Sequence, residues 1–187
     1  SYTFPVETSA RHVHLTAEDF ATLFGPDAQL TVKKELSSLP ATEGHRRWPE
    51  EEPAKVSILG PFRSQTQVEL SATDARSLGL NAPVRLSGDL KGSAPCKLVG
   101  PAGEVEIAEG VIVAKRHLHI SAAEAEKAGV SHGEVIQVKI NSENRSLIFD
   151  DVEVRVGEGC DATMHVDTDE SNAAGCTAAT VGELIKK

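Results

Sequence analysis

The segment Arg11-His-Val-His-Leu-Thr-Ala17 returns later in the chain as Arg116-His-Leu-His-Ile-Ser-Ala122. The first histidine moves from position 12 to 117 and the second from 14 to 119, so both have an offset of 105 residues. Each copy reads as a short strand, then a hydroxyl residue, an acid three positions later, and a short helix that ends at glycine. A match of this length predicts an internal duplication.

The strand-to-helix pattern occurs a third time, at Val68–Gly79. Thr16, Ser71 and Ser121 are therefore predicted helix N-caps. Between these units the chain alternates apolar and polar residues in short runs, which predict strands at 56–59, 84–86, 96–99, 104–107, 111–113, 135–140 and 152–156. Many short strands with few short helices favour closed, barrel-like β structure over a doubly wound sheet. Residues 35–54 show no period and are interpreted as an exposed loop.

The composition excludes several classes of protein. The chain has 187 residues, 40% hydrophobic and 25% charged, with a net charge of −9, which is typical of a globular protein and disfavours a nucleic-acid binder. Three cysteines, Cys96, Cys160 and Cys176, show no Cys-x-x-Cys spacing and are interpreted as reduced thiols. No leader pattern and no apolar run of about 20 residues is present, so we expect no membrane association and a cytoplasmic protein.

The histidines carry the first functional signal. Residues i and i+2 of a strand share a face, so His12 with His14, and His117 with His119, form two side-by-side imidazole pairs that could each meet on one metal ion. Duplicated pairs favour a site between the two copies with two metals, of the kind that bind Zn, Co, Ni or Fe(II). Glu69, in the third strand-to-helix unit, is the best carboxylate ligand and His165 the best fifth histidine, although either alone could be an ordinary surface or core residue. The other two histidines, His45 and His132, are interpreted as loop residues.

Basic residues lie close to the metal candidates in this acidic chain. Their placement predicts a local anion pocket, formed by Arg11, Arg63, Lys115 and Arg116. The serine-hydrolase elbow, the P-loop and the full dinucleotide glycine fingerprint are all absent from the sequence.

Five separated motifs carry a resemblance to a known family. They are Ser9-Ala-Arg-His-Val-His-Leu-Thr16, Leu59-Gly-Pro-Phe-Arg-Ser-Gln-Thr-Gln-Val-Glu69, Val84-Arg-Leu-Ser-Gly-Asp-Leu-Lys-Gly-Ser93, Ala114-Lys-Arg-His-Leu-His-Ile-Ser121 and His165-Val-Asp-Thr-Asp-Glu170 with Asn172-Ala173. In this order they resemble the propanediol-utilisation type of phosphotransacylase, the phosphate propanoyltransferases. The resemblance covers residues 5–38 and 56–175, and the segment 38–55 departs from the family pattern.

The resemblance implies a fold of two small closed β-barrels with short capping α-helices and the active site between them. One barrel would comprise residues 11–114, and the other 1–10 plus 115–187. Two Zn²⁺ ions per chain would be held by two sets of residues: His12, His14 and Glu69, and His117, His119 and His165. Arg63 would be catalytic and bind phosphate, with Ser87 as a second phosphate-binding candidate.

The implied reaction interconverts a short-chain acyl-CoA and phosphate with an acyl phosphate and CoA. We expect metal-bound phosphate to attack the thioester directly, with CoA as substrate or product and no nucleic-acid partner. Acylation of a cysteine is the alternative route. A zinc-stabilised structural or binding module and a zinc hydrolase are the alternative functions. Homo-oligomerisation, or association with a bacterial microcompartment if an N-terminal extension has been trimmed, is compatible with the resemblance.

Overall fold

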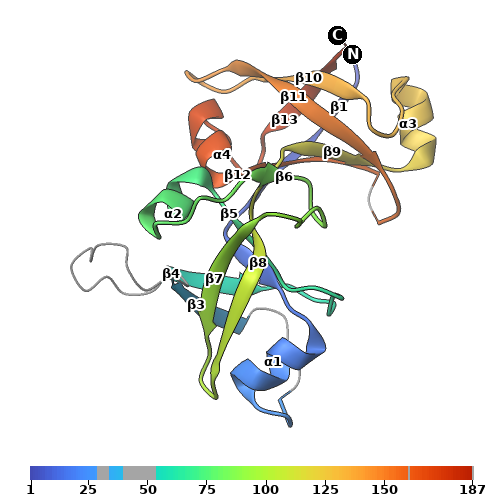
Figure 1. The fold of residues 1–187 in the computed structure, drawn as a ribbon. Helices are drawn as coiled ribbons and strands as arrows, with labels where there is room; N and C mark the ends of the chain where they lie inside the picture. Colours follow the sequence, from blue (N-terminus) through green and yellow to red (C-terminus); the bar gives the residue numbers. More distant parts are fainter. Residues whose placement is uncertain (29–33, 40–53, 160, 187) are drawn as a thin grey trace. The chain divides into compact units, whose positions relative to one another are not determined.

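The computed structural model describes residues 1–28, 34–39, 54–159 and 161–186. Contacts between Cα atoms divide the chain into two compact units (Figure 1). The first unit contains residues 11–114, and the second unit contains residues 1–10 with 115–187. Both are mostly β-structure, which confirms the predicted fold class. None of the helices in these described residues is long and apolar enough to span a membrane.

The second unit is a closed six-stranded barrel. Its strand order is β1-β12-β9-β11-β10-β13, and β13 closes the ring by pairing antiparallel with both β1 and β10. Closure leaves no exposed sheet edge. The strands are β1 (Thr3–Ser9), β9 (His117–Ile120), β10 (Val135–Ile140), β11 (Leu147–Val156), β12 (Ala162–Asp167) and β13 (Val181–Ile185), and the helices are α3 (Ala122–Ala128) and α4 (Thr168–Ala174).

Apolar side chains from alternate strand positions fill this barrel. In β9, Leu118 and Ile120 are fully buried, whereas His117 and His119 lie on the other face of the strand and are half-buried. Ile136 and Val138 from β10, and Val152 and Val154 from β11, complete the same core. The alternation explains the spacing of the histidine pair, because the residues between and after the histidines must enter the core.

The first unit is a seven-stranded sheet in the order β5-β2-β4-β3-β7-β8-β6, with an additional parallel pairing of β5 with β8. The second closed barrel implied by the family resemblance stays a prediction. The strands are β2 (His12–His14), β3 (Lys34–Leu39), β4 (Ala54–Ile58), β5 (Gln67–Leu70), β6 (Val84–Arg85), β7 (Ala94–Val99) and β8 (Glu104–Ala114), and the helices are α1 (Ala17–Phe24) and α2 (Ala72–Ser77).

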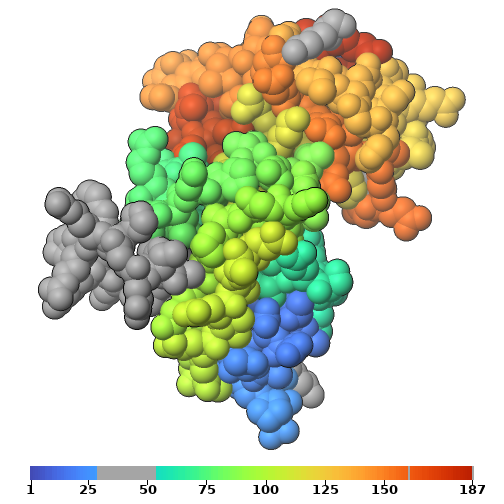
Figure 2. Space-filling model, viewed as in Figure 1, coloured from blue at the N-terminus to red at the C-terminus, as the bar shows by residue number. Residues whose placement is uncertain are grey.

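Helix α1 lies against the turn between β7 and β8, and Figure 2 shows these segments in blue and yellow-green beside each other. The backbone oxygen of Leu23 accepts from the N–H of Ala102 at 2.9 Å. A Cβ atom at Gly100 would lie 2.4 Å from that same oxygen, so glycine is required for this close approach. Leu23 joins Val13, Val56 and Val68 in the core of the first unit.

The predicted caps are confirmed. The side chains of Thr16, Ser71 and Ser121 each accept a hydrogen bond from the backbone N–H three residues later. A fourth helix, α4, was not predicted, although Asp167 and Glu170 form a complete capping box at its start.

Two predictions on the strands are corrected. Residues 35–39, interpreted as part of a loop, belong to β3, because that segment pairs with β4 and β7 on either side. The last residue of the predicted loop, Ala54, likewise belongs to a strand, β4, and residues 40–53 lie outside the described residues. The two runs 104–107 and 111–113 form one strand, β8, whose second half is buried and pairs in parallel with β5 and β6.

Candidate functional site

Strand register brings the first predicted ligand set together. In the first unit, β2 pairs antiparallel with β5, and His12 lies directly opposite Glu69. Opposed residues of antiparallel strands share a face of the sheet, and His14 shares that face because it is two residues from His12. Two strands that are distant in sequence therefore place three potential ligands on one surface.

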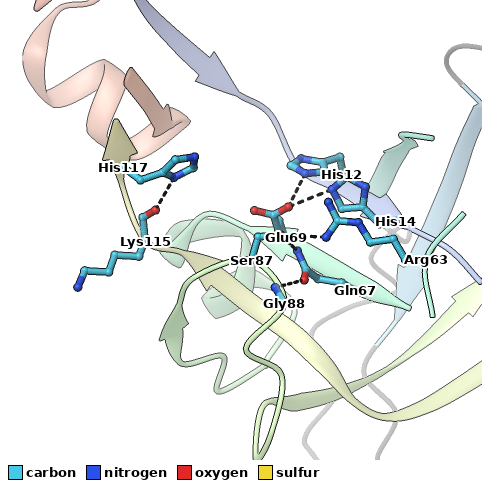
Figure 3. A network of polar contacts seen from close by, with 9 residues as sticks. All are labelled: His12, His14, Arg63, Gln67, Glu69, Ser87, Gly88, Lys115 and His117. Carbon is cyan, nitrogen blue, oxygen red and sulfur yellow. Dashed lines mark hydrogen bonds and ion pairs between the residues drawn. The ribbon is translucent and has the colours of Figure 1, made fainter. Parts of the chain in front are cut away.

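The three side chains make direct contact (Figure 3). The Oε2 atom of Glu69 lies 2.6 Å from Nε2 of His12 and 3.3 Å from Nε2 of His14. Only 10% of each histidine side chain and 12% of the glutamate side chain is exposed. Within the described part of the chain, this is the one group of three or more such residues with all ligand atoms within 4.8 Å of one another.

Glu69 carries a negative charge beside the two histidines. Burial by itself raises the pKa of the Glu69 carboxyl, but hydrogen bonds and charge interactions with His12 and His14 outweigh burial, and the net pKa lies well below its ordinary value of 4.5. A buried carboxylate needs a positive partner. Either protonated imidazoles or a bound cation can supply that charge.

The donor set fits a zinc ion. Two imidazole nitrogens and one carboxylate oxygen are ligands that Zn²⁺ accepts, and three protein ligands leave a coordination position open. The Nε2 atoms of both histidines face the Glu69 carboxylate, so all three donors are directed to one point.

A polar cluster beside β5 contains the predicted anion-binding residues, which lie in the segments before β5 and after β6. Arg63 is exposed, and its Nη1 donates to Oγ of Ser87 at 2.9 Å. Gln67, which the sequence interpretation did not single out, donates to the same Oγ at 3.0 Å and accepts from the Gly88 N–H at 2.8 Å. Figure 3 shows Arg63, Gln67 and Ser87 with Glu69, which follows Gln67 by two positions on β5.

The second predicted ligand set lies in the second unit, and its register matches that of the first set. His165 of β12 is opposite His117 of β9, and their rings stack with centroids 5.0 Å apart. The rings of His119 and His165 are 6.5 Å apart. Nδ1 of His117 lies 3.1 Å from the backbone oxygen of Lys115, and this contact is drawn as a dashed line in Figure 3. Binding of a second metal by these three histidines stays a prediction.

Three of the four basic residues expected in an anion pocket pair with carboxylates in the structure, and the pocket itself stays a prediction. Arg11 pairs with Asp74 at 3.0 Å and Arg116 with Glu170 at 2.8 Å. Lys115 pairs with Glu153 at 3.2 Å. Their partners are 38 to 63 positions away in the chain, so the sequence pattern gave no sign of them. These three cations already have an anionic partner, so Arg63 is the strongest anion-binding candidate of the four.

The cysteines are poorly suited to nucleophilic catalysis. Burial raises the pKa of the Cys96 thiol to about 12, and burial also raises the pKa of Cys176. A thiol in this state holds little of the reactive thiolate at neutral pH. Cys160 lies outside the described residues. Among the loop histidines, His132 accepts from the Val156 N–H at 3.0 Å, a structural contact, and His45 lies outside the described residues.

These features define a mostly β-protein with a buried histidine–carboxylate set and an arginine–serine pair. Comparisons with known proteins give the family. A family model described as phosphate propanoyltransferase matches residues 5–177. A protein named phosphate propanoyltransferase from Shewanella putrefaciens is 49% identical over 177 residues, covering 92% of this chain and 83% of the relative. One of the same name from Listeria monocytogenes is 46% identical over 186 residues, covering 97% and 87%. The chain therefore belongs to the phosphate propanoyltransferase family, as the resemblance predicted, and it is an acyltransferase.

Proposed function

We propose that this chain is a zinc-dependent phosphate acyltransferase that interconverts a short-chain acyl-CoA and phosphate with an acyl phosphate and CoA. Family membership supports the reaction class. The observation that carries the assignment to a site is the exposed Arg63 guanidinium, which is bonded to Ser87 and lies on the chain segment that leads into the strand of Glu69.

Arg63 and Ser87 would hold the phosphate. A guanidinium has five N–H donors, and one of those on Arg63 is used by Ser87, so the others can bind phosphate oxygens in a fork geometry. A phosphate oxygen then attacks the carbonyl carbon of the thioester, the carbon–sulfur bond breaks, and CoA leaves as a thiolate. Phosphate is substantially dianionic near neutral pH, so this step requires no dedicated general base. The raised pKa of Cys96 gives no support to the alternative cysteine route.

His12, His14 and Glu69 would hold one zinc ion, and His117, His119 and His165 the other. Bound zinc supplies positive charge and Lewis-acid polarisation for anionic substrates. Glu69 would fix the side chains of its two histidines before any ion binds, since it already contacts both. Cytoplasmic or microcompartment localisation and the oligomeric state stay predictions.

The assignment is tested with thiol release from propionyl-CoA and acetyl-CoA, measured with and without phosphate. Release that depends on phosphate is expected. Release without phosphate would instead indicate the zinc hydrolase, and no release the structural module. The variant Arg63→Ala should lower kcat/KM for phosphate about 100-fold, the effect expected for loss of charged hydrogen bonds in the transition state, while the metal content stays unchanged.

Arg76→Ala is the matched control for Arg63→Ala. Arg76 is an exposed arginine on α2 in the same unit, so its loss makes the same change in net charge. We expect Arg76→Ala to keep the wild-type phosphate dependence. If Arg76→Ala lowered kcat/KM for phosphate as much as Arg63→Ala, the effect would reflect the overall charge, and Arg63 would have no specific role.

A further inference from the structure

Gln67 is an almost completely buried polar residue next to the predicted ligands. It is 1% exposed and lies on β5, directly opposite His14 and two residues before Glu69. Because alternate residues of a strand share a face, Gln67 and Glu69 project to the same side of β5. A buried amide is destabilising unless both its ends are hydrogen-bonded.

Both ends of the Gln67 amide are satisfied by one turn. Oε1 accepts from the backbone N–H of Gly88 at 2.8 Å, and Nε2 donates to Oγ of Ser87 at 3.0 Å. A backbone N–H can only donate, so chemistry alone requires the amide oxygen to face Gly88 and the NH₂ group to face Ser87. The orientation of the amide is therefore determined by its partners.

The turn that Gln67 holds begins at Leu86 and is closed by a hydrogen bond from the Asp89 N–H to the Leu86 oxygen at 3.0 Å. Gly88 occupies its third position with φ +93°, a conformation in which glycine is favoured. Ser87 occupies the second position, so the amide of Gln67 sets both the place of the turn and the direction of the Ser87 hydroxyl.

The hydrogen bonds of Ser87 leave it one role toward a ligand. Its Oγ accepts from Nε2 of Gln67 and from Nη1 of Arg63 at 2.9 Å. Both partners can only donate, and a hydroxyl has two lone pairs and one hydrogen. With the two lone pairs engaged, the remaining capacity of Ser87 is to donate its O–H. The pair of Arg63 and Ser87 therefore offers only donors, which suits a ligand whose oxygens accept.

We propose that Gln67 is a positioning residue, which orients the Ser87 hydroxyl as a hydrogen-bond donor to the phosphate oxyanion beside Arg63. The inference rests on the proposed function, and it adds a residue that acts on phosphate through Ser87. It also links two parts of the first unit, because one strand carries the amide that orders the anion-binding turn and the carboxylate that contacts the histidines.

The test is steady-state kinetics on Gln67→Glu, Gln67→Met, Ser87→Ala and the double variant Gln67→Met/Ser87→Ala. Gln67→Glu keeps an acceptor for Gly88 but replaces the NH₂ donor by an acceptor, so Ser87 would turn its hydrogen toward residue 67. We expect Gln67→Glu, Gln67→Met and Ser87→Ala each to raise KM for phosphate about tenfold, the size of one hydrogen bond to a charged group. KM for the acyl-CoA should stay within about twofold, because the proposed effect is confined to phosphate.

The double variant separates positioning from a merely structural role. If Gln67 acts through Ser87, the double variant should have a KM for phosphate within about twofold of Ser87→Ala alone. Gln65→Met is the control, because Gln65 is an exposed glutamine on the same segment; it should keep wild-type constants.

Several outcomes overturn the inference. One is that the effects of Gln67→Met and Ser87→Ala on KM for phosphate multiply in the double variant. The others are an equal rise in KM for the acyl-CoA, an unchanged KM for phosphate in the Gln67 variants, and a Gln67→Glu protein that fails to fold. Wild-type protein without phosphate-dependent thiol release would instead refute the proposed function itself. The two failures are therefore distinguishable in one set of assays.

Discussion

The histidine strands of the two units have the same strand pairing. In the first unit, β2 pairs with β5, which places Glu69 opposite His12; in the second unit, β9 pairs with β12, which places His165 opposite His117. The arginine before each histidine pair binds the acid at the third position of the helix that follows the opposed strand, Asp74 of α2 or Glu170 of α4. The duplication seen in the sequence is thus a duplication of strand pairing and of an ion pair.

The two strand pairs differ in the residue that lies opposite the first histidine. Glu69 holds both imidazoles of the first set, with its Oε2 within 3.3 Å of each Nε2. In the second unit, His165 stacks on His117 at 5.0 Å and stands 6.5 Å from His119. The side chain of His165 is 27% exposed, against 12% for Glu69. A buried carboxylate therefore contacts both imidazoles of the first set, whereas the carboxylate nearest to His165, that of Glu7, is 3.9 Å away and exposed.

The largest expected effect comes from removing that carboxylate charge. Glu69→Gln should lose one bound metal equivalent and lower kcat at least about 100-fold, because the first set loses its only anionic ligand. Metal content by elemental analysis and the rate of thiol release check this result. Glu7→Gln is the control, since the Glu7 carboxylate lies 3.9 Å from Nδ1 of His165 and is 66% exposed. Full metal content in Glu69→Gln would contradict the proposed difference between the sets.

A smaller difference in stability is expected between the two ion pairs, Arg11–Asp74 and Arg116–Glu170. Arg116 is less exposed than Arg11, and its guanidinium also lies 5.2 Å from the centre of the Phe149 ring. We expect Arg116→Ala to lower the free energy of unfolding by about 1–2 kcal/mol and Arg11→Ala by about 0.5–1 kcal/mol. Urea unfolding measures both, with Arg76→Ala as the control. Equal losses would show that the additional burial and ring contact of Arg116 contribute nothing.

The smallest contrast concerns the helices that follow the histidine strands. At the third position of α1, Asp19 accepts from the hydroxyl of Thr66; at the third position of α3, Glu124 accepts from the phenol of Tyr2. Burial, followed by the hydrogen bond and charge of Glu124, raises the pKa of Tyr2 from 10.0 to about 12. A pKa that is raised on folding stabilises the protein fully below pH 10, and this contribution is lost as the pH rises toward 12.

Tyr2→Phe tests this pH dependence. The difference in melting temperature between wild type and Tyr2→Phe should be constant below pH 9.5 and shrink above about pH 10, where the phenol of the unfolded chain ionises. Thr66→Val should show no such shrinkage, because its hydroxyl does not titrate. A Tyr2→Phe difference that grew with pH would contradict the assigned hydrogen bond.

The sequence predicted the local features well. The histidine spacing follows from strand alternation with Leu118 and Ile120 in the core, and the caps at Thr16, Ser71 and Ser121 are confirmed, because both depend on neighbours within a few residues. Glu69 was also identified, because it repeats the strand-to-helix pattern. In each of these cases the relevant contacts are close in sequence or are repeated.

Features that depend on distant partners could not be predicted. Arg11 was assigned to an anion pocket because it adjoins the candidate metal ligands in an acidic chain, and nothing near it in sequence indicates its ion pair with Asp74, which lies 63 positions away. The role of Gln67 likewise depends on a turn about 20 positions further on. Strand β3 was missed for the same reason, since its pairing with β4 and β7 is not visible in its own composition.

We propose that the first unit's histidine–carboxylate set and the Arg63–Ser87 pair serve phosphate acyl transfer. The mass balance of one reaction tests this function, with the CoA released from propionyl-CoA and the propanoyl phosphate formed quantified together at saturating phosphate. We predict one propanoyl phosphate for each CoA, with no reaction when phosphate is omitted. Formation of free propanoate in place of propanoyl phosphate would contradict this function.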